Sequence, residues 1–119
     1  MATLIPHFSN TSRAGNLVFV SGQLPFSAPG VIVEGNIEDQ VSQCLTNIEA
    51  ALLSEGLTLQ HIVKTMVWLT SPDDFPAFNR IYAEFFPGNP PARATVCSAL
   101  MVPGALVEIE AFAYDGEEK

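Results

Sequence analysis

The stretch HIVKTMVWLT, residues 61–70, has the composition of a β-strand whose two faces are both largely apolar. β-Branched and large apolar side chains favour a strand, and alternation separates Val67 and Leu69 from Trp68. A strand of this kind needs cover on both sides, because an apolar face left in water costs free energy. The expected faces are Val63, Thr65, Val67 and Leu69 against Lys64, Met66, Trp68 and Thr70.

Turn signals and hydrophobic periodicity divide the rest of the chain into two helices and four more strands. Asn36 is expected to cap the first helix and Gly56 to end it, while Ser71 or Asp73 is expected to cap the second. The second helix should bury a stripe of Phe75, Phe78, Tyr82 and Phe85. The strands are expected at 16–23, 31–33, 61–70, 93–99 and 107–114. The order β-β-α-β-α-β-β predicts an α+β fold, a mixed sheet with two helices on one face, in a single domain spanning residues 1–119.

Two helices can cover only one face of such a sheet, which leaves the other face without cover. The last strand, VEIEAFAY, places Glu108, Glu110, Phe112 and Tyr114 together on one side. Charged residues make up only 15% of the chain, which is sparse for a small soluble domain. Contact with a ligand or with other copies of the chain would explain both observations. A solvated strand with scattered aromatic residues is the alternative.

Composition argues against several partners and cofactors. The net charge is −8, and the five Lys and Arg residues are dispersed, so neither nucleic acid nor an anionic membrane is an expected partner. The N-terminal stretch MATLIPHFSN has no pattern of a secretion signal, and we expect a cytosolic protein. Cys44 and Cys97 are expected to be buried thiols. Because His7 and His61 do not combine with them at zinc-like spacing, no metal is expected.

Several motifs resemble the RidA/YjgF family, the reactive intermediate (enamine/imine) deaminases. They are FVSGQLP at 19–25, the segment from Gln40 to Phe75, FNRIYAEFF at 78–86, PPARATV at 90–96 and VEIEAFAY at 107–114. Together they span about Phe8 to Tyr114 in the family's order. The resemblance implies a chorismate-mutase-like fold that assembles as a homotrimer with the sheets inward. It also implies a ligand site in each cleft between subunits, and no cofactor.

Arg93 is the one cation in the run from Pro90 to Tyr114, and the resemblance implies that it binds a substrate carboxylate. A guanidinium offers a planar fork that accommodates a carboxylate through two parallel hydrogen bonds. The implied reaction is hydrolysis of small imines or enamines, such as 2-aminoacrylate or 2-iminopropionate, to a 2-keto acid and ammonia. Glu108 is implied to hold the attacking water or to move a proton to nitrogen. Judged by the residues alone, Arg93 could instead reach solvent at the sheet edge, or pair with Glu108 or Glu110.

Other implied substrate-binding residues are Phe8, Ser21, Gly22, Asn79 and Thr95. Ser21 and Gly22 can equally form a simple turn at the end of a strand. The chain departs from the common family pattern at Phe8, which replaces a Tyr, at Thr95, which replaces a Cys, and at His7, which replaces a Pro.

These departures leave the choice of substrate open. One alternative is a deaminase for a larger, aminomuconate-type enamine. Another is a non-catalytic small-acid-binding or chaperone-like trimer. A ribonuclease or translation-inhibitor role, which some family names carry, conflicts with the negative charge.

Overall fold

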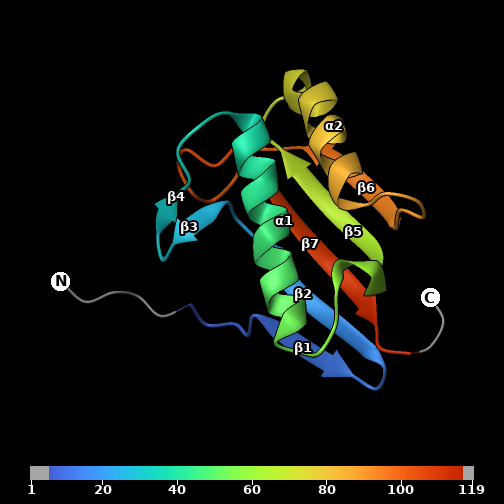
Figure 1. Ribbon diagram of the computed structural model, residues 1–119. Coiled ribbons are helices and arrows are strands. Elements are labelled where there is room, and N and C mark those ends of the chain that lie inside the picture. Colours follow the sequence, from blue (N-terminus) through green and yellow to red (C-terminus); the bar gives the residue numbers. More distant parts are fainter. Residues whose placement is uncertain (1–5, 117–119) are drawn as a thin grey trace.

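In the computed structural model, which describes residues 6–116, two helices lie on one face of a five-stranded sheet (Figure 1). The elements are β1 Thr11–Ala14, β2 Leu17–Gln23, β3 Phe26–Ala28, β4 Val31–Ile32, α1 Ile37–Leu53, the 3₁₀ helix η1 Leu59–His61, β5 Ile62–Leu69, the 3₁₀ helix η2 Pro72–Asp74, α2 Phe75–Phe85, β6 Ala92–Cys97 and β7 Val107–Tyr114. The strand order is β1-β2-β7-β5-β6, and only the β5–β6 pair is parallel. The predicted α+β architecture with a mixed sheet is therefore confirmed.

Two strands were not expected from the sequence. β1, with the sequence TSRA, is mostly exposed and has no apolar alternation. Backbone pairing with β2 and ion pairs from Arg13 to Glu55 and Asp115 hold it at the sheet edge. β3 pairs with β4 in a small separate hairpin, which the side-chain amide of Asn47 anchors by donating to the carbonyls of Leu24 and Phe26.

The ends of α1 follow from local sequence as expected. The Asn36 side chain accepts a hydrogen bond from the Asp39 amide, and the Asp39 carboxylate accepts one from the Asn36 amide, at 3.2 and 3.0 Å. Beyond the last turn, Gly56 adopts a φ of 78°, and the Leu57 amide donates to the Leu52 carbonyl at 2.9 Å. A positive φ is the conformation in which glycine is favoured over other residues.

The start of α2 is more complex than the sequence predicted. Ser71, one of the two expected caps, accepts from the Asp73 amide at 3.1 Å and begins η2. α2 itself begins only at Phe75, and Asp73 caps neither element with its side chain. Of the predicted stripe, Phe78 and Tyr82 are buried, whereas Phe75 is 39% exposed.

The helix-facing side of the sheet forms the core with α1 and α2. β7 contributes Val107, Ile109, Ala111 and Ala113, as predicted, and β5 contributes Ile62, Thr65, Val67 and Leu69. Val63 was expected on this side of β5, and that prediction is wrong. The pairing register with β7 shifts between Ile62 and Lys64, and Ile62 takes the buried position.

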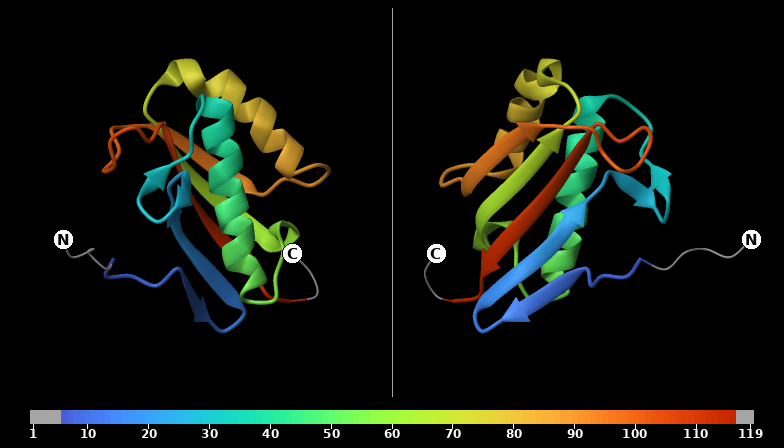
Figure 2. Two further views of the ribbon diagram at one scale, coloured as in Figure 1. Left: turned by 60° about the vertical axis from the view of Figure 1, so that its left-hand side comes forward. Right: turned by 180° about the vertical axis from the view of Figure 1, so that it is seen from behind.

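The opposite side of the sheet is bare. Viewed from behind, β2, β7, β5 and β6 present a surface over which no helix of residues 6–116 passes (Figure 2). Register places on this open face Leu17, Phe19, Lys64, Met66, Trp68, Ala94, Val96, Glu108, Glu110, Phe112 and Tyr114. Leu17, Phe19 and Val96 are among the exposed large hydrophobic residues of the described chain.

A buried glutamine ties the β6–β7 loop to α1. The Gln40 side-chain amide donates to the Gly104 carbonyl at 3.0 Å, and its oxygen accepts from the Leu106 amide at 2.7 Å. Gln40 is only 3% exposed, so these two backbone groups depend on it for their pairing.

We therefore predict that Gln40→Ala lowers the free energy of unfolding by about 1–3 kcal/mol, because it removes two hydrogen bonds made by a buried side chain. Chemical denaturation at a fixed protein concentration measures this change. Gln60→Ala, at an exposed position, should change the free energy by about 0.5 kcal/mol or less. Equal effects of the two substitutions would contradict the structural role of Gln40.

Candidate functional site

Arg93 lies on β6, an edge strand of the sheet, with its side chain on the helix-facing side. It pairs in register with Thr65 of β5, which is buried against α2. The guanidinium carbon lies 5.6, 5.2 and 4.9 Å from the ring centres of Phe75, Phe78 and Tyr82. These are cation–π distances, so the aromatic rings of α2 stabilise the charge of the guanidinium.

No carboxylate of residues 6–116 forms an ion pair with Arg93. Arg13 pairs with Glu55 and Asp115, and Arg80 pairs with Glu38. The pairing of Arg93 with Glu108 or Glu110 that the sequence left open does not form within the chain. Glu108 and Glu110 align with Trp68 and Met66 on the opposite face of the sheet.

Two hollows flank Arg93. One, of about 440 Å³, is lined by Arg93 together with Asn79, Tyr82, Ala83, Phe86, Pro90 and Pro91. The other, of about 190 Å³, is lined by Leu69, Pro72, Phe75, Thr95, Val96 and Cys97. The Thr95 hydroxyl is buried and has no hydrogen-bond partner within residues 6–116. Arg93, Asn79 and Thr95, which we name the Arg93 half-site, thus gather where β6 meets α2.

Glu108 lies on the open face of the sheet, next to an irregularity in β2. The β2–β7 register shifts between Val20 and Gln23, and this brings Gly22 against the Glu108 side chain. A Cβ atom on Gly22 would collide with the Glu108 carboxylate, so glycine leaves the space that the carboxylate occupies. Burial, and then repulsion from Glu110, raise the pKa of Glu108 above its ordinary value.

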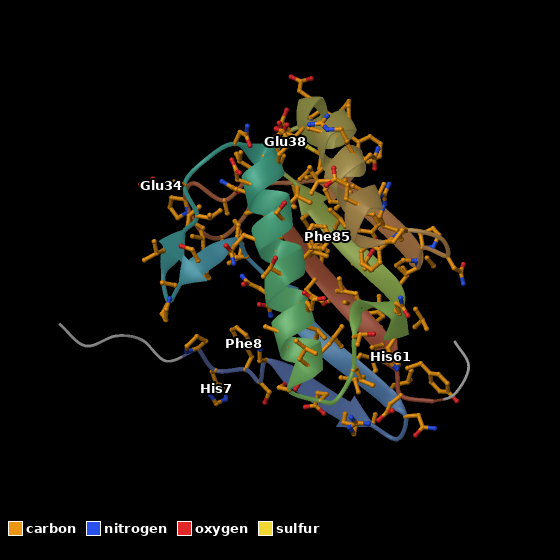
Figure 3. The ribbon with its side chains drawn as sticks, in the orientation of Figure 1. His7, Phe8, Glu34, Glu38, His61 and Phe85 are labelled. Carbon is orange, nitrogen blue, oxygen red and sulfur yellow. The ribbon has the colours of Figure 1, made fainter. Side chains whose placement is uncertain are left out.

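Ser21 holds the segment that precedes β1. Its hydroxyl donates to the Ser9 carbonyl at 2.6 Å, and its amide donates to the Asn10 carbonyl at 2.9 Å. Gln23, which the sequence analysis did not single out, adds a hydrogen bond from its amide to the Asn10 side chain at 2.9 Å. Phe8 precedes this anchored stretch and is 64% exposed. Figure 3 shows it close to His7, in the segment that leads into β1. We name Ser21, Gly22 and Glu108 the Glu108 half-site.

A single chain does not bring the two half-sites together. Arg93 and Thr95 lie on the helix-facing side of β6, at one edge of the sheet. Glu108 lies on the open face of the central strand β7. Phe8 precedes β1, which forms the edge of the sheet opposite to β6. The sequence did not reveal this separation, because it depends on the order in which the strands pair.

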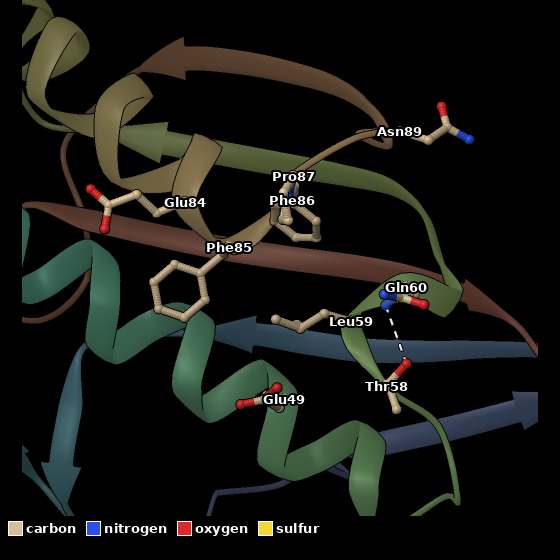
Figure 4. A pocket seen from close by; sticks show the side chains of 9 residues that line it. All are labelled: Glu49, Thr58, Leu59, Gln60, Glu84, Phe85, Phe86, Pro87 and Asn89. Carbon is tan, nitrogen blue, oxygen red and sulfur yellow. Dashed lines mark hydrogen bonds between the residues drawn. The ribbon is translucent and has the colours of Figure 1, made fainter.

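A larger hollow, of about 790 Å³, lies elsewhere, between α1, α2 and η1 (Figure 4). Glu49 of α1 and Glu84 of α2 line it together with Phe85. Its lining includes no Lys or Arg and none of the predicted site residues. A carboxylate ligand would meet like charge there, so this hollow is not the site that the sequence predicted.

The two cysteines and His61 differ in their surroundings. Cys44 is buried, and burial raises the pKa of its thiol, whereas Cys97 is exposed, contrary to the prediction that both are buried. His61 Nδ1 accepts a hydrogen bond from the Thr58 amide at 3.0 Å and so closes the η1 turn. Among residues 6–116, no three His, Cys, Asp or Glu side chains cluster as metal ligands, and no helix has the length and apolarity to span a bilayer.

Comparison with known proteins places these features in a family. The model of the family described as Endoribonuclease L-PSP matches residues 2–115. A RutC family protein of Pyrococcus horikoshii is 41% identical over 108 residues, which cover 90% of this chain and 86% of that protein.

Two solved structures share the fold closely. RidA from an Antarctic Psychrobacter is 32% identical, with a TM-score of 0.86 and coverage of 94% and 91% of the two chains. Escherichia coli TdcF with bound serine is 29% identical, with a TM-score of 0.87 and coverage of 95% and 91%. This chain therefore belongs to the Endoribonuclease L-PSP family, the YjgF/RidA family that its motifs resemble.

Proposed function

We propose that this protein hydrolyses small reactive imines and enamines, such as 2-iminopropionate and 2-aminoacrylate, to 2-keto acids and ammonia. The observation that carries the proposal is the Arg93 guanidinium, which lines a hollow and has no carboxylate partner within residues 6–116. A guanidinium without a carboxylate partner has N–H groups that can bind an anion. The carboxylate of a 2-imino acid supplies that anion in a geometry that suits the fork.

The complete site requires a second copy of the chain, and we propose a homotrimer with the sheets inward. Contact between open faces would bury apolar side chains such as Phe19 and Trp68, which helices leave uncovered. The Glu108 half-site of one protomer would then face the Arg93 half-site of its neighbour. Phe8, anchored beside Ser21, would reach the same cleft. The separation of the two half-sites on opposite faces of one chain supports this arrangement.

The chemistry needs one water and a group that moves both of its protons. With the carboxylate held by Arg93, the protonated C=N carbon is open to attack. Glu108 would accept a proton as the water oxygen bonds to this carbon, and would return it to nitrogen. The C–N bond then breaks and ammonia leaves, while the Glu108 carboxylate takes the remaining hydroxyl proton and the carbon becomes the carbonyl of a 2-keto acid. A carboxyl with a raised pKa suits both steps, because it holds and releases a proton nearer to neutral pH.

The relatives support a small carboxylate ligand. One similar structure is named RidA, and another contains serine, an α-amino acid. The family description also names an endoribonuclease, which makes RNA cleavage the second candidate. That role is harder to support here, because the net charge is −8 and ion pairs already engage Arg13 and Arg80. If the protein cleaved RNA and imines decayed no faster with it than without it, this second candidate would be favoured.

Two finer alternatives remain within the family. A non-catalytic trimer would bind 2-keto acids without accelerating imine decay, and a deaminase for larger enamines would prefer an aminomuconate-type substrate. Generating 2-iminopropionate in situ with an amino acid oxidase, and following its decay with and without this protein, tests the proposed function against both. No acceleration for any small imine would contradict the proposal.

The first prediction from this proposal concerns assembly. Sedimentation at micromolar concentration should give the mass of three chains, because the open face is apolar. Phe19→Glu should yield smaller species, since it places a charge in the proposed interface. Leu53→Glu, at an exposed apolar position of α1, should remain trimeric. A wild-type monomer would rule out the trimer.

The second prediction concerns Arg93. Arg93→Ala should lower kcat/KM by about a hundredfold, through loss of a charge-assisted bidentate contact, and the trimer should persist. Arg93→Lys should be nearly as inactive, because an ammonium lacks the fork. If Arg93 were only a structural counter-ion, Arg93→Ala would instead produce a large fall in melting temperature without ligand.

The third prediction concerns Glu108. If its carboxylate accepts the proton of water, activity should fall as pH drops through its pKa, and this limb should lie above the ordinary range of a glutamate. Glu108→Gln should abolish the limb and reduce turnover, yet retain affinity for pyruvate, because Glu108 does not hold the carboxylate. Loss of pyruvate binding in this variant would show that Glu108 serves binding instead.

A further inference from the structure

Three aromatic rings of α2 lie under the guanidinium of Arg93. Phe75, Phe78 and Tyr82 are spaced three and four residues apart, so they share one stripe of the helix, and this stripe faces β6. The ring centres of Phe75 and Phe78 are 6.5 Å apart with nearly parallel planes, and those of Phe78 and Tyr82 are 5.2 Å apart. The guanidinium therefore contacts a continuous row of rings.

This row is held in place from the strand side. The Tyr82 hydroxyl and the Thr65 hydroxyl form a buried hydrogen bond at 2.7 Å. Thr65 is the residue of β5 that pairs with Arg93, so the same strand position fixes both the cation and the last ring of the row. Phe78 is fully buried, whereas Phe75 is 39% exposed at the open end of the row.

Rings and carboxylates stabilise a guanidinium in different ways. A carboxylate takes up its N–H groups, whereas a ring attracts the charge through its face and leaves N–H groups unused. We infer that Phe75, Phe78 and Tyr82 form an aromatic cradle that positions Arg93 and keeps its N–H groups available for a substrate carboxylate. This inference rests on the proposed function, in which Arg93 binds that carboxylate. The three residues act through Arg93 and are positioning residues.

Phe75 is the member that can be tested without disturbing the core. Phe75→Leu removes the ring and retains apolar bulk. It should raise the Kd for pyruvate and the KM for the imine by about two- to fivefold, the range expected for one exposed cation–π contact. The turnover at saturation and the melting temperature should stay close to wild type. Phe75→Tyr, which restores a ring, should restore both constants.

The position of the guanidinium can be observed independently of activity. Ring currents should displace the Arg93 Nε–Hε resonance upfield in NMR spectra of the wild-type protein, with Arg93→Lys identifying the signal. Phe75→Leu should move this resonance toward the ordinary arginine position. Phe85→Leu is the matched control, because Phe85 lies on the same helix but lines the hollow toward α1 (Figure 4). It should leave the Arg93 resonance and the Kd for pyruvate unchanged.

The outcomes separate the cradle from the proposed function. An ordinary Arg93 resonance in wild type, or a Phe75→Leu protein with unchanged pyruvate affinity, would overturn the cradle. The same holds if Phe75→Leu and Phe75→Tyr weaken binding equally. A displaced resonance in a wild-type protein that binds no 2-keto acid would overturn the proposed function and, with it, the cradle's role toward substrate. A displaced resonance with fast imine decay and the Phe75→Leu changes above supports both.

Discussion

The sheet has apolar side chains on both faces, but the described chain supplies helices for only one. α1 and α2 bury one face, and on the other Phe19 is exposed while Trp68 and Phe112 are half-buried. Each square ångström of apolar surface left in water costs about 25 cal/mol, which favours association of open faces. Glu108 lies on the same face, so the surface that we propose as the interface also carries the proposed acid–base group. Assembly and chemistry would then depend on the same face.

The sequence predicted those parts of the fold that local physics decides. Asn36 with Asp39 three residues later begins a helix in most contexts, and strict alternation over Val107–Tyr114 assigned every side chain of β7 to the correct face. What it did not predict depends on partners distant in the chain. β1 has no apolar pattern and exists because β2 pairs with it, and the shift that buries Ile62 in place of Val63 is a property of the β5–β7 pair.

The candidate site divides in the same way. Family motifs named Arg93 and Glu108, but only the strand order and register reveal that they lie on opposite faces. Helical spacing correctly predicted that Phe78 and Tyr82 of α2 are buried, but Phe75 is exposed, and spacing cannot show that β6 places a guanidinium on these rings. Similarly, Gly22 was a candidate for ligand contact, and its close approach to the Glu108 carboxylate appears only in three dimensions.

Separation on opposite faces also solves an electrostatic problem. A guanidinium and a carboxylate adjacent in one chain would pair permanently and leave neither group free for substrate. Here Arg93 lies against the rings of α2, and Glu108 lies on the other face of the sheet, where burial and then Glu110 raise its pKa. If association brings the two into one cleft, a substrate carboxylate bound to Arg93 would lie between them, and Glu108 would stay free for the proton transfers.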